Sequence, residues 1–368
     1  MTSRLFTAIT LLTLAGAGCK TTKLVSSGPL SATITEEGLL TCFPANMLLK
    51  QQPVWCEASA VLFDGTKVLL ANDKDMPASL SPVFSKLPGT LPDSTQTPTY
   101  LMAPAYKLAR KYEDFAQTPD RKFTLLTTAF DRVKADSPDW NGYNTLLYWR
   151  TGNEQNPIVL TPDDSSRTSI AYRTKLARAL ANDEFPGEVP YFKVEGLAAT
   201  DQLLLFGIRE MGRAYDDFKA VNKIITVTYR VVKTPVGERI RLGDDWRVVA
   251  DFNAPNTAPD LPKPLSLSSL EYDPARNRFW LLTSLETPEK LDAYLWYILP
   301  DDLMADKPFT LVRNGQGQPL HFNHKAEDLT FLDRDRLLII HDDDRFQLPT
   351  GNKIRQPNQA PYSIVTVR

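Results

Sequence analysis

The chain has 368 residues, of which 42% are hydrophobic and 23% are charged, a composition typical of a folded globular protein. Its 42 Lys and Arg residues nearly balance its 44 Asp and Glu residues, so no excess of positive charge favours nucleic acid as a partner. Collagen-like, disordered and multi-span membrane proteins are excluded, and the 28 prolines together with recurring β-branched and aromatic runs favour many short strands joined by turns.

The N-terminus has the pattern of an export signal. Residues 1–18 contain one basic residue, Arg4, followed by an apolar run that is too short to span a membrane. The segment Gly16-Ala-Gly-Cys19 resembles the bacterial lipoprotein box, in which the cysteine carries the lipid, although Gly16 stands where Leu is usual. The resemblance implies that Cys19 is lipidated, and ordinary signal cleavage is the alternative.

The export signal sets the expected organisation and location of the chain. Residues 19–30 would form a flexible tether, and residues 31–368 a single domain. Lys20 follows the cysteine instead of the Asp that retains lipoproteins at the inner membrane. We therefore expect a lipoprotein on the periplasmic face of the outer membrane or on the cell surface, in contact with the membrane only through its anchor.

Two cysteines remain once Cys19 is assigned to the lipid. In an oxidising compartment an even pair favours a disulfide over a metal site or a nucleophile, so we predict a bond between Cys42 and Cys56. Two reduced, buried thiols are the alternative.

A repeated hairpin organises the rest of the chain. Each copy has a short strand, a turn that contains Asp, and an apolar strand too short to be a helix. The copies begin at residues 57, 113, 195, 268 and 327. Intervals of 56 to 82 residues suit four-stranded units, so the sequence predicts an all-β fold, a β-propeller with five blades and room for a sixth.

Two further elements complete this prediction. Residues 169–181 favour one inserted helix, because Arg, Ala, Leu and Lys predominate there. The last strand, residues 362–367, would close the ring by pairing with a strand near residues 31–35. No phosphate-binding Gly-rich loop, serine-hydrolase elbow or zinc-hydrolase helix occurs in the sequence.

The repeat gathers charged residues at one end of the predicted channel. Four copies open with Glu and the weak copy with Ser268, and the second strand of each strong copy ends in a charged residue. The expected neighbours are Glu57 with Asp73, Glu113 with Asp131, Glu195 with Arg209, and Glu327 with His341 and Asp342. Since the first strand of a blade lines the channel, the four Glu side chains would converge on one mouth.

Such a ring has two functional interpretations and one structural alternative. Glu57, Glu195, Glu327 and Asp342 could bind Ca²⁺ through oxygen, or a pair of carboxyl groups could act as general acid and base. Arg209 breaks the acidic pattern and would be the single local positive charge for an anionic group. The alternative is that the Glu side chains accept backbone N–H bonds from neighbouring blades and hold the blades together.

All three histidines, His321, His324 and His341, fall in the last copy of the repeat. Their spacing matches no familiar zinc motif, so metal ligation, general acid–base chemistry and a structural role all stay open. The run Asp342-Asp343-Asp344 lacks the Gly and terminal Glu of an EF-hand loop and has the pattern of a solvated turn.

The hairpins resemble those of a known family. Lys193-Val-Glu195 and Lys325-Ala-Glu327, each followed by an apolar strand, and the hairpin at Cys56-Glu-Ala-Ser-Ala60 are similar to units of the "esterase-like activity of phytase" propellers and of a related family of secreted bacterial propellers. Asp328 stands where Gly is commoner, and Ser268 replaces Glu.

The resemblance implies an envelope hydrolase of phosphate or carboxylate esters. Glu327 or His341 would activate water, while Arg209 and a bound Ca²⁺ hold the anion of the ester. The alternative function is a non-catalytic propeller of the envelope that binds a small ligand or a protein partner. In either case we expect a monomer.

Overall fold

The computed structural model describes residues 30–134, 137–344 and 346–368. The predicted signal peptide, Cys19 and nearly all of the tether lie outside these residues. Within the described part of the chain, no helix is long and apolar enough to cross a membrane.

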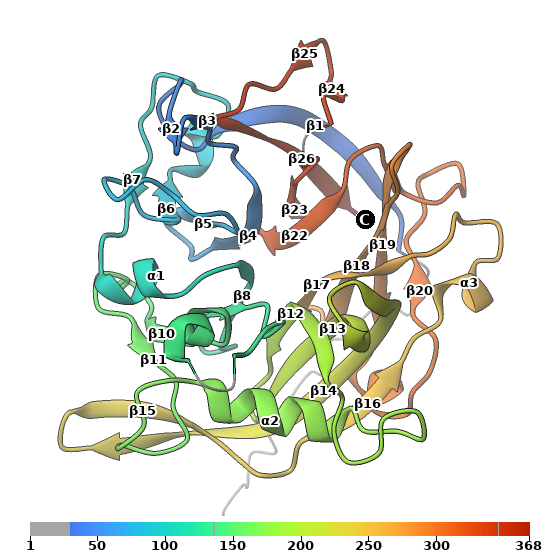
Figure 1. The fold of residues 1–368 in the computed structure, drawn as a ribbon. Helices are drawn as coiled ribbons and strands as arrows, with labels where there is room; N and C mark the ends of the chain where they lie inside the picture. The colour runs from blue at the N-terminus through green and yellow to red at the C-terminus, as the bar shows by residue number, and fades with distance from the viewer. Residues whose placement is uncertain (1–29, 135–136, 345) are drawn as a thin grey trace, which may run out of the picture.

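Five antiparallel sheets are arranged radially around one axis, as the blades of a propeller (Figure 1). We number the blades by the order of their innermost strands along the chain. Blade 1 contains β4 (Ala58–Phe63), β5 (Val68–Asn72), β6 (Val83–Lys86) and β7 (Thr99–Tyr100). Blade 2 contains β8 (Tyr112–Gln117), β9 (Phe123–Thr128), β10 (Leu146–Arg150) and β11 (Ile158–Val159).

The other three blades are larger or discontinuous. Blade 3 contains β12 (Tyr191–Ala199), β13 (Leu203–Ala214), β14 (Asp217–Thr234), β15 (Gly237–Leu242) and β16 (Arg247–Asp251). Blade 4 contains β17 (Ser266–Asp273), β18 (Arg278–Glu286), β19 (Leu291–Ile298), β20 (Thr310–Leu311) and β21 (His321–Phe322). Blade 5 contains β22 (Ala326–Phe331), β23 (Arg336–His341), β26 (Gln359–Val367) and β1 (Ala32–Thr41).

Short helices and hairpins lie outside the five blades. The α-helices are α1 (Pro104–Leu108), α2 (Ile170–Ala179), α3 (Ala254–Thr257) and α4 (Pro300–Met304), and the 3-10 helices are η1 (Pro88–Thr90) and η2 (Pro138–Tyr143). Two small hairpins are formed by β2 (Leu48–Leu49) with β3 (Gln52–Pro53) and by β24 (Pro349–Thr350) with β25 (Lys353–Ile354). Helix α2 is the inserted helix that the sequence predicts.

The ring closes as predicted, through the two ends of the domain. Strand β1 pairs antiparallel with β26 in blade 5, with Ala32 opposite Val367 and Thr41 opposite Gln359. The innermost strands contact one another in the order β4, β8, β12, β17 and β22, and β22 contacts β4 again. Blade 5 is therefore built from both ends of the domain, with β1 as its outermost strand.

The disulfide predicted between Cys42 and Cys56 is present. Cys42 directly follows β1 of blade 5 and Cys56 lies two residues before β4 of blade 1, with 6.1 Å between their Cα atoms. Both cysteines are fully buried. The bond therefore links the two blades at which the ring closes.

The apolar core lies between the blades, in five clusters that each join two neighbouring blades. Strands buried on both faces need apolar side chains at nearly every position, which explains the continuous runs in the second strand of each hairpin. Packing is tight between blades 3 and 4, where a Cβ atom on Gly207 would lie 2.6 Å from Leu267. The channel, in contrast, is lined by polar groups.

Candidate functional site

All five innermost strands carry a β-bulge close to their first residue. The ladder shifts by one residue at Ser59, Glu113, Glu195, Ser268 and Glu327. This register corrects the sequence alignment of the first copy, because Ser59, and not Glu57, occupies the position of the other Glu residues. Glu57 aligns instead with Lys111, Lys193 and Lys325, each two residues before the bulge.

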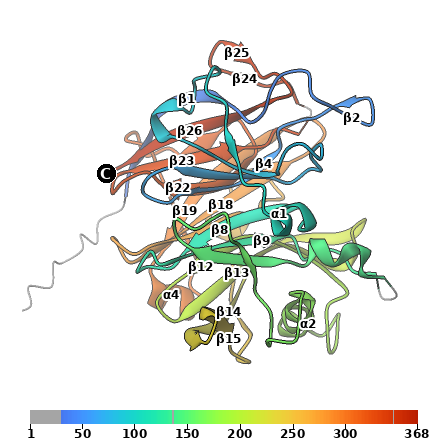
Figure 2. The same ribbon diagram turned by 90° about the vertical axis from the view of Figure 1, so that its left-hand side faces the viewer.

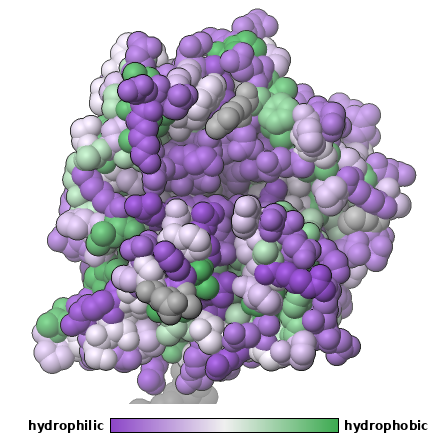
Figure 3. Space-filling model, viewed as in Figure 1, coloured by the Kyte–Doolittle hydropathy of each residue, from purple (hydrophilic) through white to green (hydrophobic). Residues whose placement is uncertain are grey.

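The starts of these strands form the mouth of the channel. Helices α1 and α2 and the β2–β3 hairpin lie on this side of the ring, and the C-terminus lies on the other (Figure 2). Figure 3 shows a hydrophilic hollow near the middle of the same face.

Lysine and glutamate alternate around the mouth. Lys325 reaches the carboxylate of Glu327, with 2.9 Å between Nζ and Oε1. Lys193 bonds Glu195 in the same way and also lies 3.6 Å from Glu113 of blade 2. The prediction that Arg209 is the single positive charge at the mouth was wrong, because Lys193 and Lys325 also lie there.

Arg209 lies where predicted, opposite Glu195. Its Nη1 atom is 3.3 Å from Oε2 of Glu195, and both side chains are buried. The guanidinium also donates to Ser284 at 2.8 Å, and Ser268 bonds the same hydroxyl. Arg209 therefore joins blade 3 to blade 4, in which serine replaces the Glu of the repeat.

Two of the carboxyl groups near Arg209, those of Glu195 and Glu327, differ in acidity. Burial would raise the pKa of Glu195, but Arg209 and Lys193 outweigh it and hold the pKa below its ordinary value. Burial raises the pKa of Glu327 to about 7, helped by repulsion from Glu195 and opposed by Lys325. One carboxylate thus stays charged while the other titrates near neutrality.

A second group of carboxylates lies beside this pair. Oxygen atoms of Glu57, Asp342 and Asp344 all lie within 4.8 Å of one another. Three carboxylates form a donor set of the kind that Ca²⁺ prefers. Lys74 lies 2.6 Å from Glu57, and Lys325 lies 3.6 Å from Asp344, so lysines already neutralise part of this charge.

The structure changes the predicted metal ligands. It brings Glu57 and Asp342 together, but it places Glu195 and Glu327 among Lys193, Arg209 and Lys325. Asp344 was missed because the run at residues 342–344 was interpreted as a solvated turn. Asp342 and Asp343 are in fact buried.

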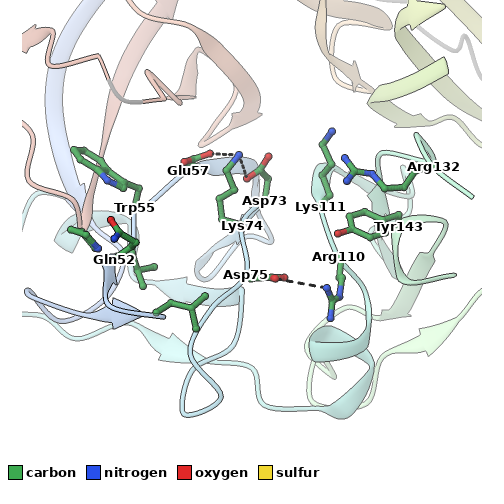
Figure 4. Close-up of a pocket in the computed structure, with 13 residues that line it drawn as sticks. Gln52, Trp55, Glu57, Asp73, Lys74, Asp75, Arg110, Lys111, Arg132 and Tyr143 are labelled. Carbon is green, nitrogen blue, oxygen red and sulfur yellow. Dashed lines mark ion pairs between the residues drawn. The ribbon is translucent and has the colours of Figure 1, made fainter. Parts of the chain in front are cut away.

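A cleft of about 460 Å³ opens next to Glu57, between blades 1 and 2. Figure 4 shows its charged walls: Glu57, Asp73 and Lys74 lie opposite Lys111, Arg132 and Tyr143. The Arg132 guanidinium lies 4.4 Å from the centre of the Tyr143 ring, and both it and Lys111 bond Asp131 behind the wall.

Other lining residues complete the cleft. Arg110 is 3.7 Å from Asp75, and Trp55 closes the side next to blade 5 (Figure 4). Of the predicted mouth residues, Glu57 and Asp73 line this cleft. Four further residues are buried and do not line the cleft: Glu113, Glu195, Arg209 and Glu327.

None of the three histidines lines the cleft, although His341 lies opposite Ala326 at the start of β22. His341 is fully buried in the packing between blades 4 and 5, with Nε2 2.8 Å from Ser363 Oγ, and burial lowers its pKa well below the ordinary value. His324 packs beside it and bonds Asp343 at 2.7 Å, and His321 bonds Asp292 at 2.5 Å. This placement favours the structural interpretation of all three.

Blade-to-blade bonds come from residues that the sequence analysis did not select. Asp114 and Asp328 each follow a bulged Glu. Asp114 accepts hydrogen bonds from the backbone N–H of Leu197 at 2.8 Å and of Leu270 at 3.3 Å. In the described part of the chain, none of the four Glu carboxylates accepts a backbone hydrogen bond, so the predicted locking role belongs to the Asp residues. The Glu-Asp pairs at 113–114 and 327–328 were the available signal.

No protein-family model matches the chain, and no curated protein matches it. Among solved structures, it is similar to an aldose sugar dehydrogenase from Streptomyces coelicolor in its PQQ-bound form, with a TM-score of 0.39, 11% identity, and coverage of 92% of this chain and 98% of that one. It is also similar to an α-L-arabinofuranosidase from Podospora anserina, with a TM-score of 0.41, 10% identity, and coverage of 88% and 94%. A further match is the catalytic domain of an α-L-arabinofuranosidase from Coprinopsis cinerea, with a TM-score of 0.42, 9% identity, and coverage of 88% and 95%. At these scores the matches carry no argument about function, and the propeller assignment rests on the sheets described above.

Proposed function

We propose that the channel mouth hydrolyses a small ester, either an anionic ester of phosphate or an ester of a carboxylic acid, as the resemblance to esterase-like phytases implies. The observation that carries the proposal is the contrast between Glu195 and Glu327. Both interact electrostatically with Arg209, yet the pKa of Glu195 is lowered and that of Glu327 is raised to about 7. Pairs of carboxyl groups with diverging pKa values are typical of acid–base active sites.

Glu327 is suited to move the proton. With a pKa near the ambient pH, it can take a proton from water as the water attacks and return it to the leaving oxygen. Arg209, fixed by Glu195 and Ser284, stabilises negative charge that develops on the ester. His341 has no part in this mechanism, because it is buried between blades.

The cleft supplies the binding energy for the anion. Arg132 and Lys111 share one carboxylate, Asp131, so their combined charge exceeds that of their partner. Together with Arg110 they form a cationic wall that fits a phosphate or carboxylate group. Tyr143 and Trp55 offer flat surfaces for the rest of the substrate.

Glu57, Asp342 and Asp344 would hold Ca²⁺, as the sequence analysis proposed for two of them. Bound there, Ca²⁺ would supply a divalent charge next to the anion-binding wall. Lys74 would move away from Glu57 on binding, because the cation would replace it as the partner of that carboxylate.

The test is hydrolysis of p-nitrophenyl phosphate and p-nitrophenyl acetate, with Ca²⁺ and with chelator. Glu327→Gln should lower kcat by about 10²- to 10⁴-fold and leave KM nearly unchanged, because it removes proton transfer only. Glu238→Gln is the matched control, since Glu238 lies far from the mouth and pairs with Arg150. Unchanged turnover in Glu327→Gln would overturn the acid–base mechanism.

A non-catalytic site for the same anions is the second candidate. It is favoured by the lysines at the mouth, which pair with the carboxylates and satisfy their charge without any reaction. Phosphate binding without turnover of either ester would support it. The lipid-anchored location in the envelope is a separate proposal, which rests on Cys19.

A further inference from the structure

The channel has a second opening, on the face opposite the mouth. A cavity of about 350 Å³ lies where β4, β8, β17 and β22 end, and we call it the distal cavity. Much of its wall is apolar or aromatic and is formed by Leu62, Phe63, Pro119, Tyr272, Phe331 and Leu332. Its volume and lining are typical of a site for a small molecule.

One carboxyl group in the distal cavity has no compensating partner. Glu271, near the end of β17, is half-buried and lines the cavity. Among the residues that the structure describes, no hydrogen bond or ion pair reaches its carboxyl group. Its charged neighbours are carboxyl groups: Asp328 of blade 5, Asp114 of blade 2 and Asp273 of its own strand.

Each of these neighbours has a partner of its own. Asp114 and Asp328 accept backbone hydrogen bonds, and Asp273 pairs with Arg276 at 3.2 Å. The carboxyl group that lacks a partner is therefore that of Glu271, which lines the largely apolar cavity.

The cations of the distal cavity lie at its rim. Arg121 and Arg334 line the cavity but are exposed, and Arg121 donates to Gln117 at 3.0 Å. Charges in contact with water are screened, whereas a half-buried charge among apolar groups acts in a lower dielectric. The rim arginines therefore do not compensate Glu271.

We propose that the distal cavity binds an organic ammonium ion, whose charge pairs with Glu271 and whose apolar body contacts Phe63, Tyr272 and Phe331. Aromatic faces attract cations as well as apolar groups, so the walls and the carboxylate favour the same ligand. This site is independent of the proposed hydrolysis at the mouth.

Binding is expected to release a proton from Glu271. Burial and the neighbouring Asp328 and Asp273 raise the pKa of Glu271 well above its ordinary value. A cation stabilises the charged form, so the proton leaves when the ligand enters. The rim charges of Arg121, Arg334 and Asp333 are exposed and affect this release only weakly.

The test uses three probes of similar size: benzyltrimethylammonium, benzyl alcohol and benzoate. Calorimetry on the wild-type protein should give a Kd for benzyltrimethylammonium at least tenfold lower than for the other two. Titration in two buffers of different ionisation enthalpy should count a proton released on binding. Glu271→Gln should lose both the preference for the cation and the proton release.

Two control variants locate the site. Glu57→Gln removes a carboxylate from the mouth and should leave binding of benzyltrimethylammonium unchanged, and Arg334→Gln should not weaken it. The proposal is overturned if no probe binds, if benzoate binds best, or if Glu57→Gln removes the preference for the cation. The selectivity of the wild-type protein is informative even if Glu271→Gln does not fold.

Discussion

Asp114 and Asp328 interact at the buried centre of the channel, although blade 2 supplies one and blade 5 the other. Asp114 accepts backbone bonds from blades 3 and 4. Asp328 accepts a bond from the Val61 N–H of blade 1 at 2.7 Å and one from the Ser269 hydroxyl of blade 4 at 2.7 Å. Two carboxyl groups thus connect all five blades.

This pair makes stability depend on pH. Burial raises the pKa of Asp328 to about 7, and burial together with Asp328 raises that of Asp114. A carboxyl group with a raised pKa in the folded state binds its proton more tightly there than in the unfolded chain. Its contribution is complete below pH of about 4 and is lost as pH rises through about 7.

Asp328→Asn should therefore lose part of the pH dependence. At pH 5 it should be less stable than wild type by about 1 to 3 kcal/mol, because an amide nitrogen cannot accept the hydrogen bonds that one carboxylate oxygen accepts. The difference should shrink as pH rises from 5 to 8. Urea unfolding at each pH measures it, and a constant difference would show that Asp328 does not titrate in this range.

The disulfide should stabilise the ring closure. Cys42 and Cys56 are separated by 14 residues, and a loop of this size predicts about 3 kcal/mol on the chain-entropy account. The variant with both cysteines changed to Ala should lose about that much stability in denaturant. Reductant should destabilise the wild type but not the variant, and equal sensitivity of the two would contradict the assignment.

The fold was predictable from the sequence where the repeat is regular. Apolar second strands at intervals of 56 to 82 residues predicted the blades, and the last strand predicted closure by β1, because both depend on burial of continuous strands. The alignment of Glu57 with Glu113 was wrong because Ser59 stands where other copies have Glu, so a Glu two residues earlier in the chain was matched to the repeat.

The charges at the mouth were less predictable. Lys193 and Lys325 each precede a Glu by two residues, close enough along the chain for the side chains to meet, so their pairing could have been inferred from the sequence. The proximity of Glu57 and Asp344 could not have been inferred from the sequence. It depends on loops of blades 1 and 5 that lie side by side only in the closed ring.

Different Glu residues of the mouth should respond differently to the same substitution. Glu195→Gln breaks buried pairs with Lys193 and Arg209 and should cost about 3 kcal/mol. Glu57 has a raised pKa, because of burial and Asp73, so Glu57→Gln should change stability little without Ca²⁺.

Melting temperatures with Ca²⁺ and with chelator separate these effects. Stabilisation by Ca²⁺ should vanish in Glu57→Gln and persist in Glu195→Gln. Equal loss of stability in both variants, with no response to Ca²⁺, would exclude the cation site.

The proposed lipid anchor on Cys19 can be tested by finding which cell fraction contains the protein. Cys19→Ser should move the protein from the membrane fraction to the soluble fraction of the envelope, because the lipid is the only predicted contact with the membrane. Fractionation followed by immunoblotting measures this change. Lys20→Ala is a matched control, which should stay with the membrane fraction.

The pH dependence of hydrolysis connects Arg209 to Glu327. If Glu327 is the base, kcat/KM should rise with pH and level off above about 7, because only the ionised carboxylate accepts a proton. Arg209 lowers the pKa of Glu327, so Arg209→Gln should move the rise of kcat/KM to higher pH. Arg209→Lys keeps the charge, so the rise should stay near pH 7.

Both variants disturb the bonds from Arg209 to Glu195 and Ser284. A loss of rate that is common to the two variants would therefore show that Arg209 has a positioning role. A shift of the pH dependence in Arg209→Gln alone would show the effect of the Arg209 charge on Glu327. If kcat/KM rises at the same pH in both variants, the titrating group is not Glu327.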